Sequence, residues 1–196
     1  MNEWTIKNAY LLPLISEIMD KLKGANYFTK LDVQWGYNNI RIQEGDEWKA
    51  IFKTNRGLFE PMVMFFGMCN SPATFQSMMD LIFIKEIEEG VTIVYMDNIL
   101  IYATTPELLE KYTKQILQKL QDHNLFLKAK KCEFGKTKLE YLGLIMEEGK
   151  LSMDPVKVTG FANWPVPSEG STVLPRLWEF LQKIHCEILY FGCTLQ

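Results

Sequence analysis

Apolar residues recur every three to four positions in several parts of the chain, which is the spacing of a helix with one buried face. These segments are 13–23, 71–87 and 106–122, and a fourth candidate begins at Pro155. Ser71 as the N-cap and Pro72 in the first turn give the second helix a typical start. The sequence therefore predicts helices separated by segments of another kind.

Apolar and polar residues alternate in those other segments, as they do in half-buried strands. The segments are 26–34, 39–43, 48–54, 58–65, 125–128 and 138–146. Residues 92–102 are two apolar runs around the polar centre Met96-Asp97-Asn98, which predicts a buried hairpin. Strands and helices follow one another without a regular strand–helix–strand repeat. We therefore expect an α+β fold, an antiparallel sheet with helices on one face.

The composition is that of a folded and mildly acidic protein. Hydrophobic residues make up 47% of the 196 residues and the net charge is −3, so nucleic acid could bind only at a local basic patch. The four cysteines form no CxxC pair and there are two histidines, which argues against a zinc site. There is no signal-peptide pattern and no apolar run of roughly 20 residues. We expect an intracellular protein, in a cytoplasmic particle or the nucleus, without a membrane partner.

Two aspartates stand inside apolar strand patterns, where a carboxylate needs a partner. Asp32 follows Leu31 in the strand at 26–34, and Asp97 lies at the centre of the hairpin. A divalent cation such as Mg²⁺ would be a suitable partner for both. An ordinary turn is the simpler explanation for Asp97, because Asp and Asn favour turns. The residues alone leave both interpretations open.

Lysines are concentrated between residues 111 and 138, where eight of them are accompanied only by the acidic residues Asp122 and Glu133. Such a run is typical of a solvated helix face. It would also suit contact with a phosphate backbone. The sequence does not decide between the two.

Five stretches, in this order, resemble the reverse transcriptase of gypsy-class LTR retrotransposons. They are YFTKLDVQWGYNNIRI at 27–42, TNRGLFEP at 54–61, FFGMCNSPATFQ at 65–76, YMDN at 95–98, and KCEF at 131–134 with YLG at 141–143. Their order and spacing make the resemblance specific, and it runs from about residue 5 to about residue 167. It implies the palm of a right-hand polymerase, acting as an RNA-directed and DNA-directed DNA polymerase by two-metal nucleotidyl transfer.

The resemblance also implies roles for individual residues. Asp32 and Asp97 are similar to the palm aspartates that bind two Mg²⁺ ions, which Mn²⁺ can replace. The other implied residues are Lys131 as a catalytic residue beside the triphosphate, Tyr37, Phe66, Gly67 and Gln76 at the nucleotide, Ser71 and Pro72 on the template side, and Tyr141, Leu142 and Gly143 as the primer grip. The implied partners are an RNA or DNA template-primer and a dNTP.

Asn98 departs from the family pattern, because it stands where the family has a further catalytic aspartate. A neutral amide binds a hard cation less well than a carboxylate does, so we expect weakened polymerase activity. The alternative is an inactive retroelement remnant that acts, if at all, as a nucleic-acid-binding or structural domain.

The resemblance also divides the chain. We expect residues 1–24 to be a remnant of the fingers–palm connection and residues 25–153 to form the palm. Residues 154–171 are expected to be a linker toward the thumb, and residues 172–196 a divergent tail, disordered or a short helix. On this interpretation the fingers are incomplete and the thumb is lost or degenerate. Full activity would then need the missing fingers, thumb and RNase H regions.

Overall fold

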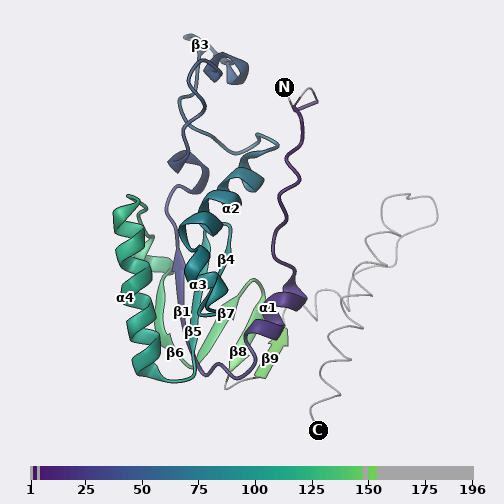
Figure 1. Cartoon of the computed structure of the whole chain (residues 1–196). Coiled ribbons are helices and arrows are strands. Elements are labelled where there is room, and N and C mark those ends of the chain that lie inside the picture. Colours follow the sequence, from purple (N-terminus) through teal and green to yellow (C-terminus); the bar gives the residue numbers. More distant parts are fainter. Residues whose placement is uncertain (1, 4, 148–149, 154–196) are drawn as a thin grey trace, which may run out of the picture. The chain divides into compact units, whose positions relative to one another are not determined.

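A four-stranded antiparallel sheet, in the order β4-β5-β1-β6, lies at the centre of the fold (Figure 1). The computed structural model describes residues 2–3, 5–147 and 150–153, so the predicted linker and tail lie outside the described residues. The strands are β1 (Tyr27–Asp32), β4 (Thr92–Tyr95), β5 (Asn98–Ala103) and β6 (Glu133–Lys136). The hairpin predicted at 92–102 is β4 and β5, and its register places Asn98 opposite both Tyr95 and Asp32.

Both faces of this sheet are buried, because side chains alternate along β5. Ile99 and Ile101 belong to the core under three helices, and Leu100 and Tyr102 belong to the core on the opposite face. The three helices are α2 (Ser71–Ile82), α3 (Ile84–Glu88) and α4 (Pro106–Asp122). The predicted arrangement of helices on one face thus holds for these three. Helix α1 (Ile15–Lys21) is the exception, since its residue Ile18 packs in the opposite core.

A second, three-stranded antiparallel sheet shares that opposite core. Its strands are β7 (Lys138–Tyr141), β8 (Leu144–Glu147) and β9 (Lys150–Met153). Leu139 and Met146 carry its apolar side into contact with the central sheet. The prediction of one strand at 138–146 was wrong, because Leu142 and Gly143 have positive φ angles of 52° and 83° and turn the chain back.

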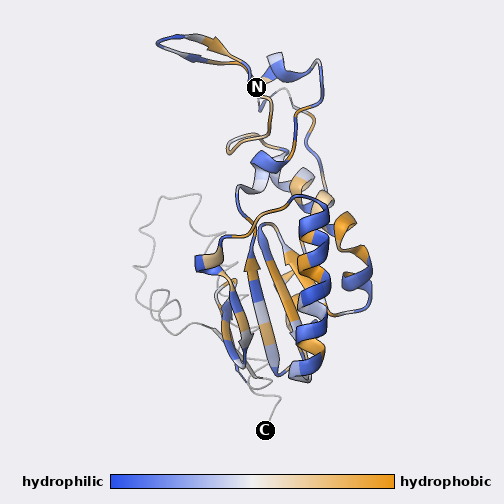
Figure 2. Cartoon of the chain, turned by 90° about the vertical axis from the view of Figure 1, so that its left-hand side faces the viewer, coloured by the Kyte–Doolittle hydropathy of each residue, from blue (hydrophilic) through white to orange (hydrophobic). Residues whose placement is uncertain are grey.

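Helix α4 covers the central sheet with a sharply divided surface, apolar toward the sheet and polar outward (Figure 2). Leu109, Ile116 and Leu120 are buried. The hydroxyl of Thr105 accepts a hydrogen bond from the amide of Leu108 at 3.4 Å, and so caps the helix. The bounds of α4 match the predicted segment 106–122.

The helix predicted at 71–87 is present but is divided at Phe83 into α2 and α3. Its predicted N-cap was wrong. Asn70 occupies the N-cap position, and the Ser71 hydroxyl instead donates a hydrogen bond to the carbonyl of Phe65 at 3.3 Å. The first turn does contain Pro72, which has no amide hydrogen to leave unpaired there.

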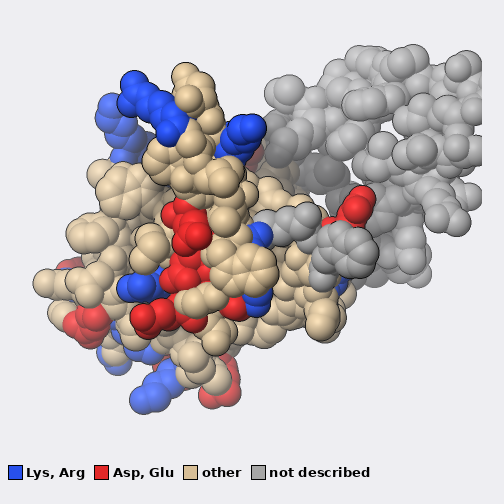
Figure 3. Space-filling view, turned by 90° about the horizontal axis from the view of Figure 1, so that it is seen from above, with Lys and Arg blue, Asp and Glu red and all other residues tan. Residues whose placement is uncertain are grey.

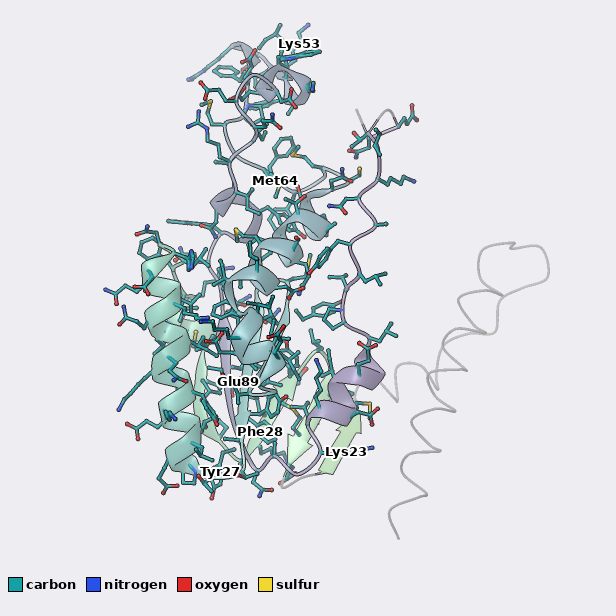
Figure 4. The ribbon with its side chains drawn as sticks, in the orientation of Figure 1. Lys23, Tyr27, Phe28, Lys53, Met64 and Glu89 are labelled. Atoms are coloured by element: carbon teal, nitrogen blue, oxygen red, sulfur yellow. The ribbon has the colours of Figure 1, made fainter. Side chains whose placement is uncertain are left out.

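Residues 36–64 form an outer segment beyond one end of the sheet. It contains the 3₁₀ helices η1 (Gly36–Asn39) and η2 (Glu47–Ala50) and the hairpin β2 (Phe52–Thr54) and β3 (Gly57–Phe59). Figure 4 shows Lys53 and Met64 in this segment, far from Tyr27 and Phe28 at the start of β1. The end of β1 that carries Asp32 is therefore the end nearer the outer segment.

Two of the predicted strands are present only as isolated β-bridges. Residues 39–43 contribute only the pair Arg41–Val63, and residues 125–128 only the pair Val33–Leu127. The strands expected at 48–54 and 58–65 are present in shortened form as β2 and β3. Among the described residues, no helix is long and apolar enough to cross a membrane.

Candidate active site

Asp32 and Asp97 lie together at one end of the central sheet. Asp32 is the last residue of β1 and pairs in register with Asn98, the first residue of β5. Asp97 occupies the turn just before, and its carbonyl accepts a hydrogen bond from the amide of Val33 at 2.7 Å. Neighbouring strands are about 4.8 Å apart, so this register brings the two aspartates to the same small region. The spacing along the chain could not reveal this, but the pairing does.

The Asp32 carboxylate is buried, with 5% of the residue exposed, and it faces two lysines. Lys128 Nζ lies 3.5 Å from Oδ1 and Lys131 Nζ lies 3.4 Å from Oδ2. Both distances are long for charge-assisted hydrogen bonds. The Oδ1 atom is shielded from solvent and has no hydrogen-bond donor. A buried carboxylate oxygen without a hydrogen-bond donor is costly, and the Lys128 ammonium at 3.5 Å is the positive charge nearest to this atom among the described ion pairs.

Asn98 is directly beside Asp97. Its side-chain amide donates a hydrogen bond to Asp97 Oδ1 at 3.2 Å. An aspartate at this position would offer an oxygen instead of a donor. Within the described residues, no group of three or more His, Cys, Asp or Glu side chains is arranged to hold a metal ion. The site thus has two carboxylates and one amide.

The turn that carries Asp97 is held from behind by Gln76, which is fully buried on α2. Gln76 Oε1 accepts a hydrogen bond from the amide of Met96 at 2.7 Å, and its Nε2 donates to the carbonyl of Val94 at 3.0 Å. Met96 has a φ of 56°, which is unfavourable for a residue with a side chain. Gln76 therefore fixes the backbone of the turn, and its contact with the nucleotide stays a prediction.

A cavity of about 340 Å³ opens beside Asp97 and Asn98. The aromatic rings of Tyr37 and Phe66 form part of its wall, with their centroids 4.9 Å apart. Burial raises the pKa of Tyr37, and the charge of Asp97 raises it further, so this hydroxyl stays neutral at ordinary pH. Phe66 is 77% exposed, which leaves its ring free to contact a ligand, and Gly67 follows it with a φ of 103°.

Backbone strain is concentrated around this cavity. Among the described residues, four non-glycine residues have positive φ angles, and three of them line it: Trp35, Met96 and Leu142. Residues held in this region cost on the order of 1–3 kcal/mol each, and such strain gathers at functional sites. The cavity is therefore the strongest candidate for a binding site in the described part of the chain.

The turn between β7 and β8 completes the cavity wall through Leu142. Tyr141 anchors this turn, because its hydroxyl donates a hydrogen bond to the carbonyl of Asn98 at 3.2 Å. Burial, followed by the proximity of Tyr95 and Asp97, holds the pKa of Tyr141 well above its usual range. Tyr141 thus ties the segment of the predicted primer grip, Tyr141 to Gly143, to the residue that follows Asp97.

The sequence prediction missed Lys128 as a site residue. It lines the cavity and its ammonium group faces Asp32. The lysine-rich run was the available signal, and the structure divides that run. Among the described residues, Lys114 and Lys119 on α4 pair with Glu110 and Glu86, whereas Lys128 and Lys131 pair with Asp32 in the site.

Comparison with known proteins agrees with this geometry. The family model for reverse transcriptase (RNA-dependent DNA polymerase) matches residues 1–146. The Transposon Tf2-7 and Tf2-3 polyproteins of Schizosaccharomyces pombe are each 35% identical over 185 residues, which cover 94% of this chain and 14% of each polyprotein. The chain therefore spans only about a seventh of the length of these relatives.

Solved structures show the same fold. The foamy viral protease-reverse transcriptase in complex with double-stranded DNA matches with a TM-score of 0.76 and 17% identity, over 85% of this chain and 29% of that one. Its complex with an RNA/DNA hybrid matches with a TM-score of 0.71 and 16% identity, over 85% and 22%. The fold prediction is confirmed, and the family match over residues 1–146 shows that this chain belongs to the reverse transcriptase (RNA-dependent DNA polymerase) family.

Proposed function

We propose that this chain is the palm-bearing region of a retrotransposon reverse transcriptase, which extends a DNA primer on an RNA or DNA template. One observation carries the proposal. Asp32 and Asp97 meet at the ends of paired strands beside a strained cavity, and the buried Asp32 Oδ1 has no hydrogen-bond donor.

The donor set fits divalent cations. Asp32 and Asp97 supply the carboxylate oxygens that Mg²⁺ and Mn²⁺ prefer, and the unsatisfied Oδ1 atom of Asp32 is the best-placed of them. Two bound cations would lower the pKa of the primer 3′-hydroxyl and neutralise charge on the triphosphate. The role of the chain is to hold these carboxylates fixed: Gln76 and Tyr141 bind the backbone on either side of Asp97, and the pairing of β1 with β5 positions Asp32.

The other residues of the cavity suit a nucleotide. Tyr37 and Phe66 offer apolar ring surface to a sugar and a base. Lys128 and Lys131 bring two positive charges to the carboxylate end, where a triphosphate would carry its negative charge. Leu142, at its strained turn, faces the same cavity and would contact the primer terminus.

A template-primer is the nucleic-acid partner that we propose. The matched foamy viral enzymes are described in complex with double-stranded DNA and with an RNA/DNA hybrid. Figure 3 shows acidic and basic side chains interspersed on the end of the molecule that carries β3, in keeping with the net charge of −3. Nucleic acid would therefore be held mainly through local contacts, and binding should weaken as salt rises in proportion to the number of phosphates that the lysines contact.

Asn98 makes this site weaker than one with a third carboxylate. It removes one negative charge, and its amide hydrogen occupies Asp97 Oδ1 at 3.2 Å. Both effects lower cation affinity. A domain that binds nucleic acid without catalysis is the second candidate function, and the absence of a three-ligand metal cluster among the described residues favours it.

Primer extension tests the proposal. Templates of RNA and of DNA are copied with Mg²⁺ or Mn²⁺ by the wild-type chain and by the Asp32→Asn, Asp97→Asn and Asn98→Asp variants. We expect slow extension by the wild type, none by the first two variants and faster extension by the third. Extension by the Asp97→Asn variant at the wild-type rate would refute the assigned site. Nucleic-acid binding with no extension in any variant would favour the second candidate.

A further inference from the structure

Residues 5–10 run along α2 as an N-terminal strap, and hydrogen bonds hold it there. Ile6 is 91% exposed, so the strap buries little apolar surface at this point. The amide of Asn8 donates to Asn70 Oδ1 at 3.0 Å, and Asn70 Nδ2 donates to the carbonyl of Ile6 at 2.9 Å. At its far end, the hydroxyl of Tyr10 donates to Asp80 Oδ2 at 2.7 Å. Asn70 and Asp80 both belong to α2 or its N-cap.

The bond at Tyr10 continues into the candidate active site. Asp80 uses its other oxygen, Oδ1, to accept a hydrogen bond from Gln76 Nε2 at 2.8 Å. Gln76 Oε1 in turn accepts the amide of Met96 at 2.7 Å, directly before Asp97. Tyr10, Asp80 and Gln76 thus form a hydrogen-bonded relay from the strap to the strained turn.

Asp80 is one of three groups that set which way the Gln76 amide faces. With the Nε2 group directed at Asp80 and the Val94 carbonyl, Oε1 is the atom left to face the Met96 amide. A flipped amide would set its oxygen against two acceptors and its NH₂ against a donor, with three bonds lost. Asp80 therefore contributes one of the three bonds that favour the arrangement fixing the turn, and Tyr10 bonds to the other oxygen of Asp80.

The surroundings make Tyr10 depend on this bond. Its side chain borders a groove of about 480 Å³ that is otherwise lined mainly by residues of α1, α2, α3 and β4, Asp80 and Val94 among them. Tyr10 is 40% exposed, so packing alone restrains it weakly. The hydrogen bond to Asp80, assisted by burial and by the charge of Asp80, also raises the pKa of Tyr10.

We propose that Tyr10 and Asp80 are positioning residues for Asp97, acting through Gln76. Neither touches the carboxylate, and their contribution is to keep the turn from Met96 to Asp97 in its strained conformation. The catalytic part of this inference rests on the proposed polymerase function. The structural part, the coupling of the strap to the turn, does not.

The experiment measures amide hydrogen exchange at Met96 in the full chain without added metal, for wild type, Tyr10→Phe and Asp80→Asn. Tyr112→Phe is the matched control, because it removes a tyrosine hydroxyl from α4 and leaves the relay intact. We expect exchange at Met96 to become about two- to tenfold faster in Tyr10→Phe, the effect of weakening one hydrogen bond, and faster still in Asp80→Asn. Urea unfolding identifies any variant that fails to fold. If Asp80→Asn fails to fold, the exchange rate measured in Tyr10→Phe tests the proposal.

Unchanged Met96 exchange in folded Tyr10→Phe, with faster exchange of the strap amides, would overturn the coupling. Primer extension supplies the second readout: Tyr10→Phe should lower kcat and leave the KM for dNTP near the wild-type value. A fall in kcat no larger than in Tyr112→Phe would overturn the positioning role. If the wild type shows no extension, the proposed function fails, and the exchange data still decide whether the relay exists.

Discussion

Asn98→Asp is the substitution that should change this site most informatively. The Asn98 side chain donates to Asp97 Oδ1 at 3.2 Å and stands opposite Asp32 in the sheet. The aspartate variant replaces this donor with a second negative charge. Two unit charges about 4 Å apart repel by about 4 kcal/mol at an effective dielectric constant of about 20. Asp97 and Asn98 are partly exposed, so screening reduces the cost, and we expect a loss of about 1–3 kcal/mol without divalent cations.

Mg²⁺ or Mn²⁺ should reverse this loss. A cation that binds only the folded chain stabilises it by about 2.7 kcal/mol at a concentration 100 times its Kd. The third carboxylate raises cation affinity, so the same concentration should stabilise the variant more than the wild type. Thermal unfolding measures both effects, since 1 kcal/mol shifts the Tm by about 2–4 °C for a chain of this size.

The matched control is Asn26→Asp, which adds the same charge at an exposed position away from the cavity. It should change neither the Tm without cations nor the response to them. The contrary result is an Asn98→Asp variant that unfolds at the wild-type Tm without cations and gains no more from Mg²⁺ than the wild type does. Asn98 would then not be a weakened metal-ligand position.

Three further predictions concern the surrounding fold. The pKa of Tyr141 is raised in the folded chain, so its contribution to the free energy of unfolding should be fully present below about pH 10 and fall by about 1.4 kcal/mol per pH unit above it. Tyr141→Phe should reduce this pH dependence in urea unfolding. The same slope in the variant and the wild type would contradict the prediction. Lys119→Met leaves the buried Glu86 carboxylate unpaired, so the free energy of unfolding in urea should fall by about 3 kcal/mol. The double variant with Glu86→Gln should largely restore it, and a fall below about 1 kcal/mol in Lys119→Met would contradict the prediction. Phe83→Ala empties a fully buried position under the sheet and should cost about 3–5 kcal/mol by the same assay, with a smaller effect pointing to a core that collapses around the site.

Local patterns in the sequence predicted the elements whose start, end and buried face are determined by residues within the element. Helix α4 has apolar residues on one side and a capping threonine, so its bounds could be predicted to the residue. The β4–β5 hairpin combines β-rich runs with a polar centre. In both cases, the information lies within a single stretch of chain.

Predictions that depended on a distant partner were less successful. Residues 39–43 alternate like a strand, yet only Arg41 forms a bridge, because the matching segment around Val63 pairs at a single residue. Ser71 looked like an N-cap, but its hydroxyl bonds to Phe65, and that contact depends on how the preceding loop folds. Alternation and capping preferences describe what a segment can do, and tertiary contacts determine what it does.

The candidate site shows the same division. The positions of Asp32 and Asp97 stood out because carboxylates are unusual in apolar strands. The proximity of Lys128 to Asp32, and the burial of Gln76 behind the turn, arise from the packing of three separate elements. Neither could be derived from spacing along the chain.

The most direct test of the central claim is titration calorimetry of Mn²⁺ and Mg²⁺ with the purified chain and its Asp32→Asn and Asp97→Asn variants. We expect the wild type to bind these cations and each substitution to abolish the binding, with all three chains folded by circular dichroism. Binding that persists in both variants would place the cation elsewhere. A folded wild-type chain that binds neither cation would contradict the claim that these two aspartates form a working metal site.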